Sequence, residues 1–372
     1  PLSAQVGPGR GRGVVTATRR CVLDAQHRAL GARMTPFGGW EMPLQYTGVL
    51  EEHRACRSRG VVFDVSHLGS VMLEGPGAFE AIQRLFTNDL GRIEPGRAQY
   101  TLLLDEADAH AVDDLIIWWL GPERFHVIPN ASNTAAVLDA LREEAGTGTS
   151  VNEVTGERAL LAVQGPAARA ALSKVSEDLA QVGHFEVGSF PFAGVDCLVG
   201  GTGYTGEDGV EVLVPSATAG SLFEALLDAG LSPAGLGARD TLRLEMGYPL
   251  HGHELGPGIT PNQAGLNWAV GWDKATFRGR EALAREREAG VARRLCGLLA
   301  EGRQAPRSGC SVMRGDEVLG EVTSGNFSPT LERGIGLALL DATHTDLVEV
   351  TIDVRGRSVP ARVMRPPFIP PR

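Results

Sequence analysis

A ten-residue stretch, AVDDLIIWWL at residues 111–120, constrains the fold of this chain more than any other segment. Its valine, leucine, isoleucine and tryptophan residues predict a buried strand, yet Asp113 and Asp114 lie near its start. Burying an ionised carboxylate without partners costs several kcal/mol, so a strand of this kind normally excludes charge. The two acids therefore either have specific partners or belong to a solvated turn that leads into the strand.

Strand geometry separates the two acids, because neighbouring side chains point to opposite faces. The alternation places Val112, Asp114, Ile116 and Trp118 on one face, and Asp113, Leu115, Ile117 and Trp119 on the other. We therefore do not expect a proton-sharing dyad. If the strand reaches the acids, one of them faces a cavity while the other makes a structural hydrogen bond.

The composition restricts the class of protein. With 35 basic and 45 acidic side chains the net charge is −10, which argues against nucleic acid or an anionic membrane as a partner. Only Lys174 and Lys274 are lysines. We expect neither to be desolvated, which disfavours Schiff-base chemistry. The five cysteines form no CxxC pair, no apolar span reaches 18 residues, and we expect a soluble, cytoplasmic protein without a metal.

The order of predicted elements indicates an α+β fold with an all-β end. Residues 100–104 and 112–120 read as a hairpin, followed by a strand at 125–128 and a helix from Asn133 or Thr134 to Glu144. A similar set follows, with strands at 160–163, 195–199 and 210–214 and a helix at 217–229. The last part predicts an all-β module, with short strands at 295–299, 318–322, 335–340, 348–354 and 359–363.

Three further motifs are candidates for binding. GTGYTGEDGVEV at 201–212 lacks a P-loop lysine and is acidic, so it suits a ligand that donates N–H groups, with Glu211 as the acceptor; an acidic turn is the alternative. Arg239, in GLGARDTLRLE, contacts either a ligand or an internal acid such as Asp240. His251 and His253 lack a third ligand and are weak metal candidates.

These segments occur in the order typical of one family, and the chain resembles the glycine cleavage T-protein (aminomethyltransferase) family. The matching segments are GARMTPFGGWEMPLQYTGVLEEH (31–53), FDVSHLG (63–69), TND (87–89), VDDLI (112–116), AVQGPAA (162–168), TGYTGEDGVEV (202–212), GLGARDTLRLE (235–245) and TSGNFSPTL (323–331).

The resemblance implies a three-domain, cloverleaf-like fold with two mixed α/β domains and a C-terminal distorted β-barrel. We expect a disordered extension at 1–18, a discontinuous first domain at 19–64 and 142–260, and a second domain at 65–141. A connecting segment at 261–284 and the barrel at 285–372 would complete the chain.

The resemblance also implies an activity: transfer of the one-carbon unit of an aminomethyl-lipoyl carrier, the H-protein, to tetrahydrofolate, with release of ammonia. Asp114 corresponds to the catalytic acid of the family, Glu211 to a pterin contact and Arg239 to a ligand-contacting arginine. Other positions that match the folate pocket are Tyr100, Asn130, Tyr204 and Tyr248.

The chain departs from the family at three places. A Gly-Gly turn usually precedes the acid pair, whereas DEADAHAVDD has one extra residue, so Asp108–His110 must turn differently. His251 replaces a tyrosine, and Gln263 replaces an acid.

Two other functions stay open on the same fold: a folate-dependent demethylase of a free small substrate, and a non-catalytic folate-binding protein that aids iron–sulfur assembly. Members of the latter group carry a cysteine that HGHEL at 251–255 lacks.

Overall fold

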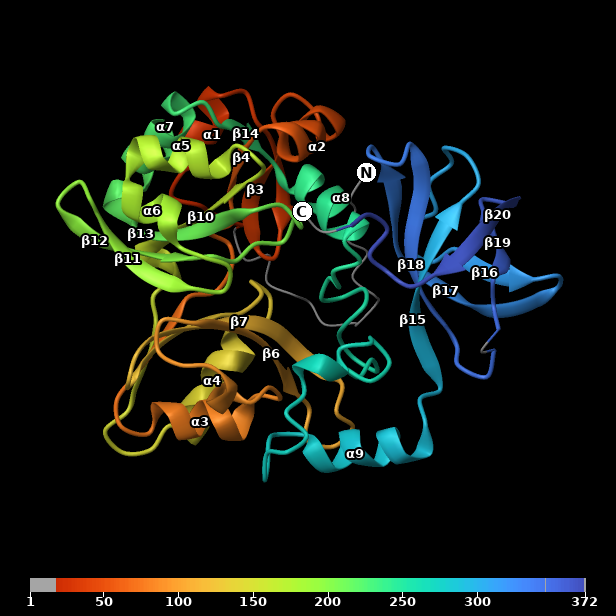
Figure 1. Ribbon diagram of the computed structural model, residues 1–372. Helices are drawn as coiled ribbons and strands as arrows, with labels where there is room; N and C mark the ends of the chain where they lie inside the picture. Colours follow the sequence, from red (N-terminus) through yellow and green to blue (C-terminus); the bar gives the residue numbers. More distant parts are fainter. Residues whose placement is uncertain (1–17, 345, 371–372) are drawn as a thin grey trace.

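Three lobes, each built on its own β-sheet, meet at the middle of the molecule in the computed structural model (Figure 1). The structure describes residues 18–344 and 346–370. The predicted extension at 1–18 therefore lies outside the described residues, except for Thr18. Within the described ranges, no helix combines the length and apolar character needed to cross a membrane.

The first lobe contains a six-stranded sheet with helices on both faces. Its inner strands β4 (Val61–Asp64) and β10 (Arg158–Gln164) read as nearly continuous apolar runs because both faces are buried. Helices α5 (Ala168–Val175) and α7 (Ser216–Asp228) pack on one face, and α2 (Val49–Ser58) and α8 (Leu236–Glu245) pack on the other. The strands, in sheet order, are β11 (Val187–Phe192), β12 (Val195–Gly200), β13 (Gly209–Pro215), β10 (Arg158–Gln164), β4 (Val61–Asp64) and β14 (Ser232–Ala234).

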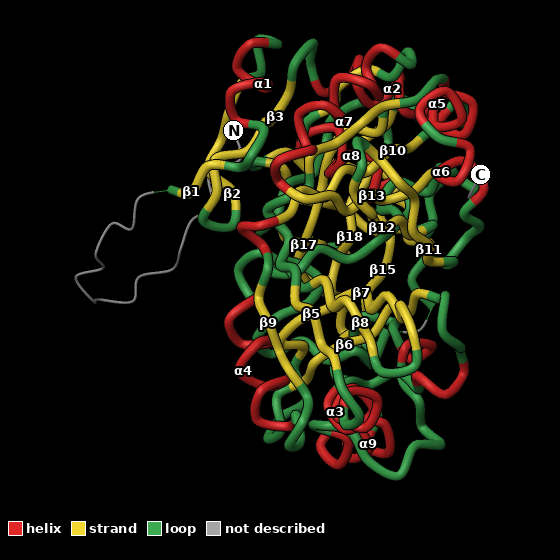
Figure 2. The backbone as a smooth tube through the Cα atoms, turned by 90° about the vertical axis from the view of Figure 1, so that its left-hand side faces the viewer, coloured by secondary structure: helices red, strands yellow, loops and turns green. Residues whose placement is uncertain are grey.

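The helices of this lobe are α1 (Asp24–Ala29), α2 (Val49–Ser58), α5 (Ala168–Val175), α6 (Glu177–Gln181), α7 (Ser216–Asp228) and α8 (Leu236–Glu245), with a short helix η2 (Thr155–Glu157). A small sheet of β1 (Arg19–Arg20), β3 (Trp40–Gln45) and β2 (Arg33–Phe37) lies beside it, as Figure 2 shows.

The second lobe is a five-stranded sheet in the order β6 (Ala98–Leu104), β7 (Ala111–Gly121), β8 (Arg124–Ile128), β5 (Val71–Glu74) and β9 (Ser150–Glu153). Helices α3 (Ala78–Leu85) and α4 (Thr134–Glu144) cover one face, and η1 (Leu90–Arg92) follows α3. The predicted hairpin and third strand are confirmed. Asn133 precedes α4 as expected, but its side chain makes no cap hydrogen bond.

The extra residue before the acid pair is absorbed in a β-bulge. Leu103 pairs with Asp113 and Leu104 with Ala111, which leaves Val112 without a partner in the ladder. Val112 therefore packs with the core of the α3 and α4 face, and its predicted place beside Asp114 is wrong. From Asp113 onward the alternation holds, since Leu115 packs toward α3 and α4 and Trp118 toward the first lobe.

The hairpin turn that replaces the Gly-Gly turn is held by carboxylates. Ala109 adopts a left-handed φ of 58°, a conformation that glycine accepts more easily. The Asp105 Oδ1 atom accepts a 2.8 Å hydrogen bond from the backbone N–H of Ala107. The Asp108 Oδ1 atom accepts one of 3.0 Å from that of His110. Side-chain acceptors thus stabilise a turn that lacks glycine.

The third lobe is a closed barrel of six strands in the order β15 (Arg293–Ala300), β18 (Arg333–Asp341), β17 (Glu317–Ser328), β16 (Ser311–Arg314), β19 (Glu349–Val354) and β20 (Arg357–Met364). The five predicted strands are confirmed, and β16 was missed. Helices η3 (Asn267–Ala269) and α9 (Arg280–Ala289) lie in the segment before the barrel. The domain boundaries stay a prediction, but β9 favours moving the one at residue 142 to after Glu153, because β9 pairs with β5.

Candidate functional site

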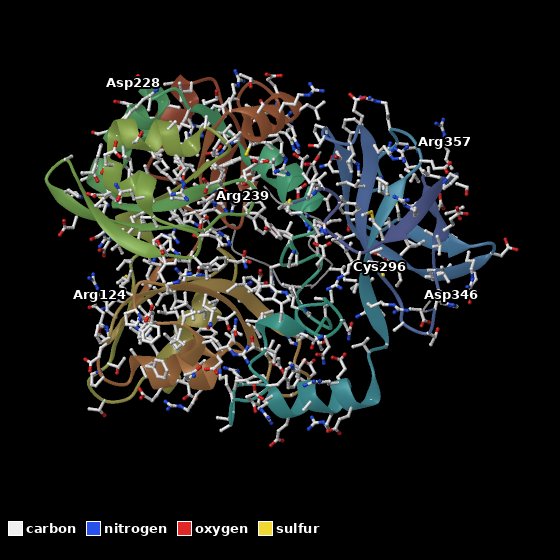
Figure 3. All side chains as sticks on the ribbon, in the orientation of Figure 1. Arg124, Asp228, Arg239, Cys296, Asp346 and Arg357 are labelled. Atoms are coloured by element: carbon white, nitrogen blue, oxygen red, sulfur yellow. The ribbon has the colours of Figure 1, made fainter. Side chains whose placement is uncertain are left out.

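A cavity of about 2770 Å³ is lined by residues of all three lobes. Every residue that the family resemblance implied for a folate site contributes to its wall: Tyr100, Asp114, Asn130, Tyr204, Glu211, Arg239 and Tyr248. Figure 3 places Arg239 near the centre of the molecule and Cys296, another lining residue, on the barrel side. The structure thus brings together groups that are up to 148 positions apart in the sequence.

The two acids of β7 occupy different environments. Asp113 is fully buried and accepts hydrogen bonds from the side-chain amides of Asn130 (2.8 Å) and Asn133 (2.7 Å). Asp114 faces the cavity and accepts a 3.1 Å hydrogen bond from the Tyr100 hydroxyl. The Asn130 amide also donates to the Asp114 carboxylate, at 3.0 Å. The predicted division of the pair, one acid toward a cavity and one toward the scaffold, is confirmed.

Burial makes both acids weaker. Desolvation, followed by the adjacent charge of Asp114, raises the pKa of Asp113 to about 8, although amide donors oppose this effect. Desolvation also raises the pKa of Asp114, against the opposing effects of His251 and of the Tyr100 hydroxyl. A carboxylate with a raised pKa accepts a proton more readily, which suits a group that handles protons at neutral pH.

Arg239 has no ion-pair partner among the described residues. Its Nη1 atom is buried without a hydrogen-bond acceptor there, and burial lowers its pKa. The alternative that Asp240 holds Arg239 is wrong, because Asp240 lies 2.9 Å from Arg243 instead. Arg243 also contacts Glu254 at 3.0 Å, so one helical turn separates a paired arginine from a free one. An unpaired buried guanidinium on a cavity wall indicates a ligand with an acceptor atom.

Glu211 lies in β13 on the same cavity wall and is 6% exposed. Its Oε2 atom accepts a 2.5 Å hydrogen bond from the Thr202 hydroxyl. The predicted alternative, an acidic turn, is wrong for Glu211, which is part of a buried strand. A fixed, buried carboxylate of this kind can accept paired N–H donors from a ligand.

Two tyrosines form an aromatic wall beside Arg239. Tyr204 and Tyr248 stack at 5.8 Å between ring centroids, and the Arg239 guanidinium lies 4.8 Å from the Tyr204 centroid. The Tyr204 hydroxyl donates to the Pro249 carbonyl. Burial raises the pKa of Tyr204, so its hydroxyl stays protonated. The wall is therefore apolar and cationic, with a fixed orientation.

His251 and His253 point to separate partners. His251 Nε2 lies 3.3 Å from the Ala111 carbonyl oxygen and His253 Nδ1 lies 2.8 Å from that of Thr323. Two other groups within the described ranges bring three possible ligand atoms to within 4.8 Å of one another. They are Cys21, His27 and Asp64, and Asp105, Asp108 and His110. None of these six residues lines the cavity.

Sequence reasoning missed an exposed tryptophan on the cavity wall and the burial of a lysine. Trp268 lines the cavity with 62% of its surface exposed, and no pattern in the sequence marks it. Lys274 was expected to be solvated, but it is 9% exposed and donates to the carbonyls of Phe86 (2.6 Å) and Asn88 (3.0 Å). Desolvation lowers the pKa of Lys274 to about 8. The acceptors lie almost 190 positions away, so local sequence carries no signal of them.

Known proteins share this sequence and architecture over nearly the whole chain. Residues 23–274 match the GCVT N-terminal domain and residues 293–369 the glycine cleavage T-protein C-terminal barrel domain. An aminomethyltransferase of Mycolicibacterium paratuberculosis is 48% identical over 353 residues, covering 93% of this chain and 96% of that protein. An aminomethyltransferase of Parafrankia sp. is 49% identical over 358 residues, and the match covers 94% of this chain and 98% of that protein.

A solved structure agrees with the sequence comparisons. The crystal structure of the glycine cleavage system aminomethyltransferase T from Bartonella henselae has a TM-score of 0.89 and 34% identity, and the match covers 95% of this chain and 99% of that one. The closed barrel and the two lobes that combine a sheet with helices follow the arrangement that the resemblance implied. The chain belongs to the glycine cleavage T-protein (aminomethyltransferase) family.

Proposed function

We propose that this chain transfers the one-carbon unit of an aminomethyl group, carried on the lipoyl arm of an H-protein, to tetrahydrofolate. The carbon loses its bonds to sulfur and to the amino nitrogen and gains bonds to two folate nitrogens. The products are the free thiol, ammonia and methylenetetrahydrofolate. Two folate N–H protons are released in the exchange, and one each reaches the sulfur and the departing nitrogen.

The observation that carries this proposal is a carboxylate, Asp114, with a raised pKa on the wall of a large cavity. We assign it the proton transfers between the folate nitrogens and the departing amine. Tyr100 and Asn130 hold its two oxygens at 3.1 Å and 3.0 Å, so its orientation is fixed before substrate arrives.

The remaining groups fit a folate. The buried Glu211 carboxylate can accept two N–H donors of an aminopyrimidine edge, and the unpartnered Nη1 of Arg239 can donate to an acceptor on the same molecule. Tyr204 and Tyr248 supply flat apolar surface. Tetrahydrofolate supplies the nucleophilic nitrogens when bound, and the residues of this chain bind it, orient it and move protons.

Turnover tests the proposal directly. The chain is incubated with tetrahydrofolate and an aminomethylated lipoyl carrier, and ammonia and methylenetetrahydrofolate are measured. We expect both products in equal amounts, and Asp114→Asn should reduce turnover by orders of magnitude. Turnover no faster than the uncatalysed rate would refute the proposal. Demethylation of a free N-methylated amino acid, in place of carrier turnover, would favour the alternative enzyme on this fold.

The proposal assigns no step to a metal ion. A chelator added to the same assay should therefore leave turnover unchanged, and a loss that zinc or magnesium restores would contradict this part of the proposal.

A further inference from the structure

Three side chains of the kinds that bind metal ions meet inside the first lobe. Cys21 lies between β1 and α1, His27 lies in α1 and Asp64 ends β4, and one ligand atom of each lies within 4.8 Å of the other two. All three are buried, with 4%, 0% and 1% of their surfaces exposed. Figures 1 and 2 show α1 at the outer end of this lobe, and the three residues are not among those that line the cavity. The cluster is therefore separate from the site around Asp114.

Two of these side chains are held in a fixed orientation by neighbours. The Tyr46 hydroxyl lies 2.9 Å from His27 Nδ1, so it can accept the proton of that nitrogen and leave Nε2 as the ligand atom. Asp64 Oδ1 accepts a 2.8 Å hydrogen bond from the Ser66 backbone N–H, and Asp64 Oδ2 faces His27. Support of this kind is typical of histidine and carboxylate groups that bind a metal ion.

The third group, Cys21, distinguishes this cluster from an ordinary buried ion pair. Asp64 and His27 can stabilise one another without further help, since His27 Nε2 lies 2.8 Å from Asp64 Oδ2. The Cys21 thiol adds a soft donor that hydrogen-bonds to the same carboxylate, and the Leu23 backbone N–H hydrogen-bonds to its sulfur. No metal site was expected from the sequence, because the spacing of these three residues matches no zinc motif.

We propose that Cys21, His27 and Asp64 bind a zinc ion that joins α1 and the segment before it to strand β4. A thiolate, an imidazole and a carboxylate are typical zinc ligands, and a solvent molecule completes the coordination where a protein supplies three. Atoms bonded to one zinc ion lie about 3 to 4 Å apart, so His27 Nε2 and Asp64 Oδ2 separate by roughly half an ångström as the ion enters. The thiol proton leaves to solvent. An entry path exists, because Arg20 and Val22 on either side of Cys21 are exposed.

Cobalt(II) is the probe for this site, because it occupies zinc sites and its bond to a thiolate absorbs in the near ultraviolet. The full chain, dialysed against a chelator, is titrated with cobalt and then with zinc. We expect one cobalt ion per chain with thiolate absorption, loss of that absorption when zinc displaces cobalt, and a higher midpoint of thermal unfolding in zinc. Cys21→Ser should lose the absorption. Tyr46→Phe should weaken the binding of zinc about 10- to 100-fold, because His27 loses the partner that fixes its ring.

Cys197→Ser is the matched control. Cys197 is fully buried in β12 of the same lobe, its thiol donates to the Val195 carbonyl at 3.8 Å, and it belongs to neither group of possible metal ligands among the described residues. This variant should keep the cobalt–thiolate absorption and the stabilisation by zinc. Turnover should be equal with and without zinc at a temperature where both forms are folded, since no proposed ligand lines the cavity.

Three outcomes would overturn the inference. They are a wild-type chain without cobalt–thiolate absorption, absorption that persists in Cys21→Ser, and zinc binding that Asp108→Asn abolishes while Cys21→Ser leaves it intact. The last would place the ion at the hairpin turn of Asp105, Asp108 and His110. If Cys21→Ser fails to fold, the absorption of the wild type and the weakened binding of zinc by Tyr46→Phe decide the question. None of these results depends on the proposed transfer reaction.

Discussion

Replacement of Glu245 by glutamine should destabilise the fold by a few kcal/mol, because this carboxylate joins two lobes. Glu245 ends α8 and is completely buried. It accepts hydrogen bonds from Arg57 of α2 at 2.8 Å and from the hydroxyls of Ser328 (2.5 Å) and Thr330 (3.0 Å) on the barrel side. His53 Nε2 lies 3.2 Å away. A neutral amide would keep the volume but lose the charge and several acceptor positions.

The size of the effect follows from the titration of this group. Hydrogen bonds and the nearby cations outweigh desolvation and lower the pKa of Glu245 from 4.5 to about 2. A difference of this size corresponds to roughly 3 kcal/mol at neutral pH. Removing one partner of a buried ion pair costs about 3 to 5 kcal/mol, which agrees with this figure. We therefore expect Glu245→Gln to lower the free energy of unfolding by about 3 kcal/mol.

The pH dependence of this contribution has a definite sign. Because the folded-state pKa is depressed, the stabilisation is complete above the ordinary pKa of 4.5 and is lost as pH falls toward 2. The difference between the wild type and Glu245→Gln should therefore be largest near neutral pH and shrink on acidification.

Urea unfolding at pH 7 and at pH 4, followed by circular dichroism, measures both the size and the sign. The control is Glu332→Gln, which breaks an ion pair with Arg303 at 3.4 Å in which both side chains are 64% exposed. An exposed pair contributes about 0 to 1 kcal/mol. If the two substitutions lowered the free energy of unfolding equally at pH 7, the contacts of Glu245 between the two lobes would not stabilise the fold.

Two other substitutions separate binding from stability. Arg239→Met should weaken the binding of tetrahydrofolate by at least about tenfold in a calorimetric titration. Urea unfolding should show no loss of stability, since the guanidinium has no ion-pair partner among the described residues. A clear loss of stability with unchanged affinity would contradict a ligand-binding role. Lys274→Met should lower the free energy of unfolding by about 1 to 3 kcal/mol, because two buried carbonyls lose their hydrogen-bond donor. The pKa of Lys274 is lowered from 10.5 to about 8, so the unfolded chain binds more protons than the folded chain between these pH values. The free energy of unfolding of the wild type should therefore rise relative to that of Lys274→Met as pH increases from 8 to 10.5. A difference in this free energy that stays constant over that range would contradict the argument.

Period-two alternation was sufficient to predict the division of Asp113 and Asp114, because faces of a strand depend only on local geometry. It failed at Val112, because a bulge is set by the register with β6 and not by the strand itself. The short strand β16 escaped detection for a similar reason. Its four residues, SVMR, have no strong pattern of their own and are ordered by pairing with β17 and β19.

The arginines show a second limit of sequence reasoning. Arg239 and Arg243 lie one helical turn apart, and Asp240 is close to both in the sequence. Asp240 pairs with Arg243, whose guanidinium is also bound by Glu254 and Ser324 from outside the helix. The free guanidinium, the group that matters for a ligand, could be identified only after its neighbour's partners were known.

The buried acid of the pair should matter less for turnover at pH 7 than its neighbour does. Desolvation and the adjacent charge of Asp114 raise the pKa of Asp113, so this side chain takes up a proton more readily than an ordinary aspartate. Asp113→Asn keeps the volume and one acceptor oxygen, and the hydrogen bond that it loses is the one that the Asn130 backbone N–H donates at 3.1 Å. We expect Asp113→Asn to lower stability by about 1 to 3 kcal/mol.

Turnover per folded molecule should accordingly stay within severalfold of the wild type at pH 7, whereas Asp114→Asn loses orders of magnitude. The two enzymes should diverge as pH rises, because only the wild type can gain a negative charge at position 113, beside Asp114. Because the Asn130 amide donates to both carboxylates, that charge reaches the reacting group through a shared partner. A pH profile of kcat for the folded fraction of each variant measures this. If Asp113→Asn were as inactive as Asp114→Asn at pH 7, the buried acid would have to act as an ionised group, and the assignment of the proton to it would be wrong.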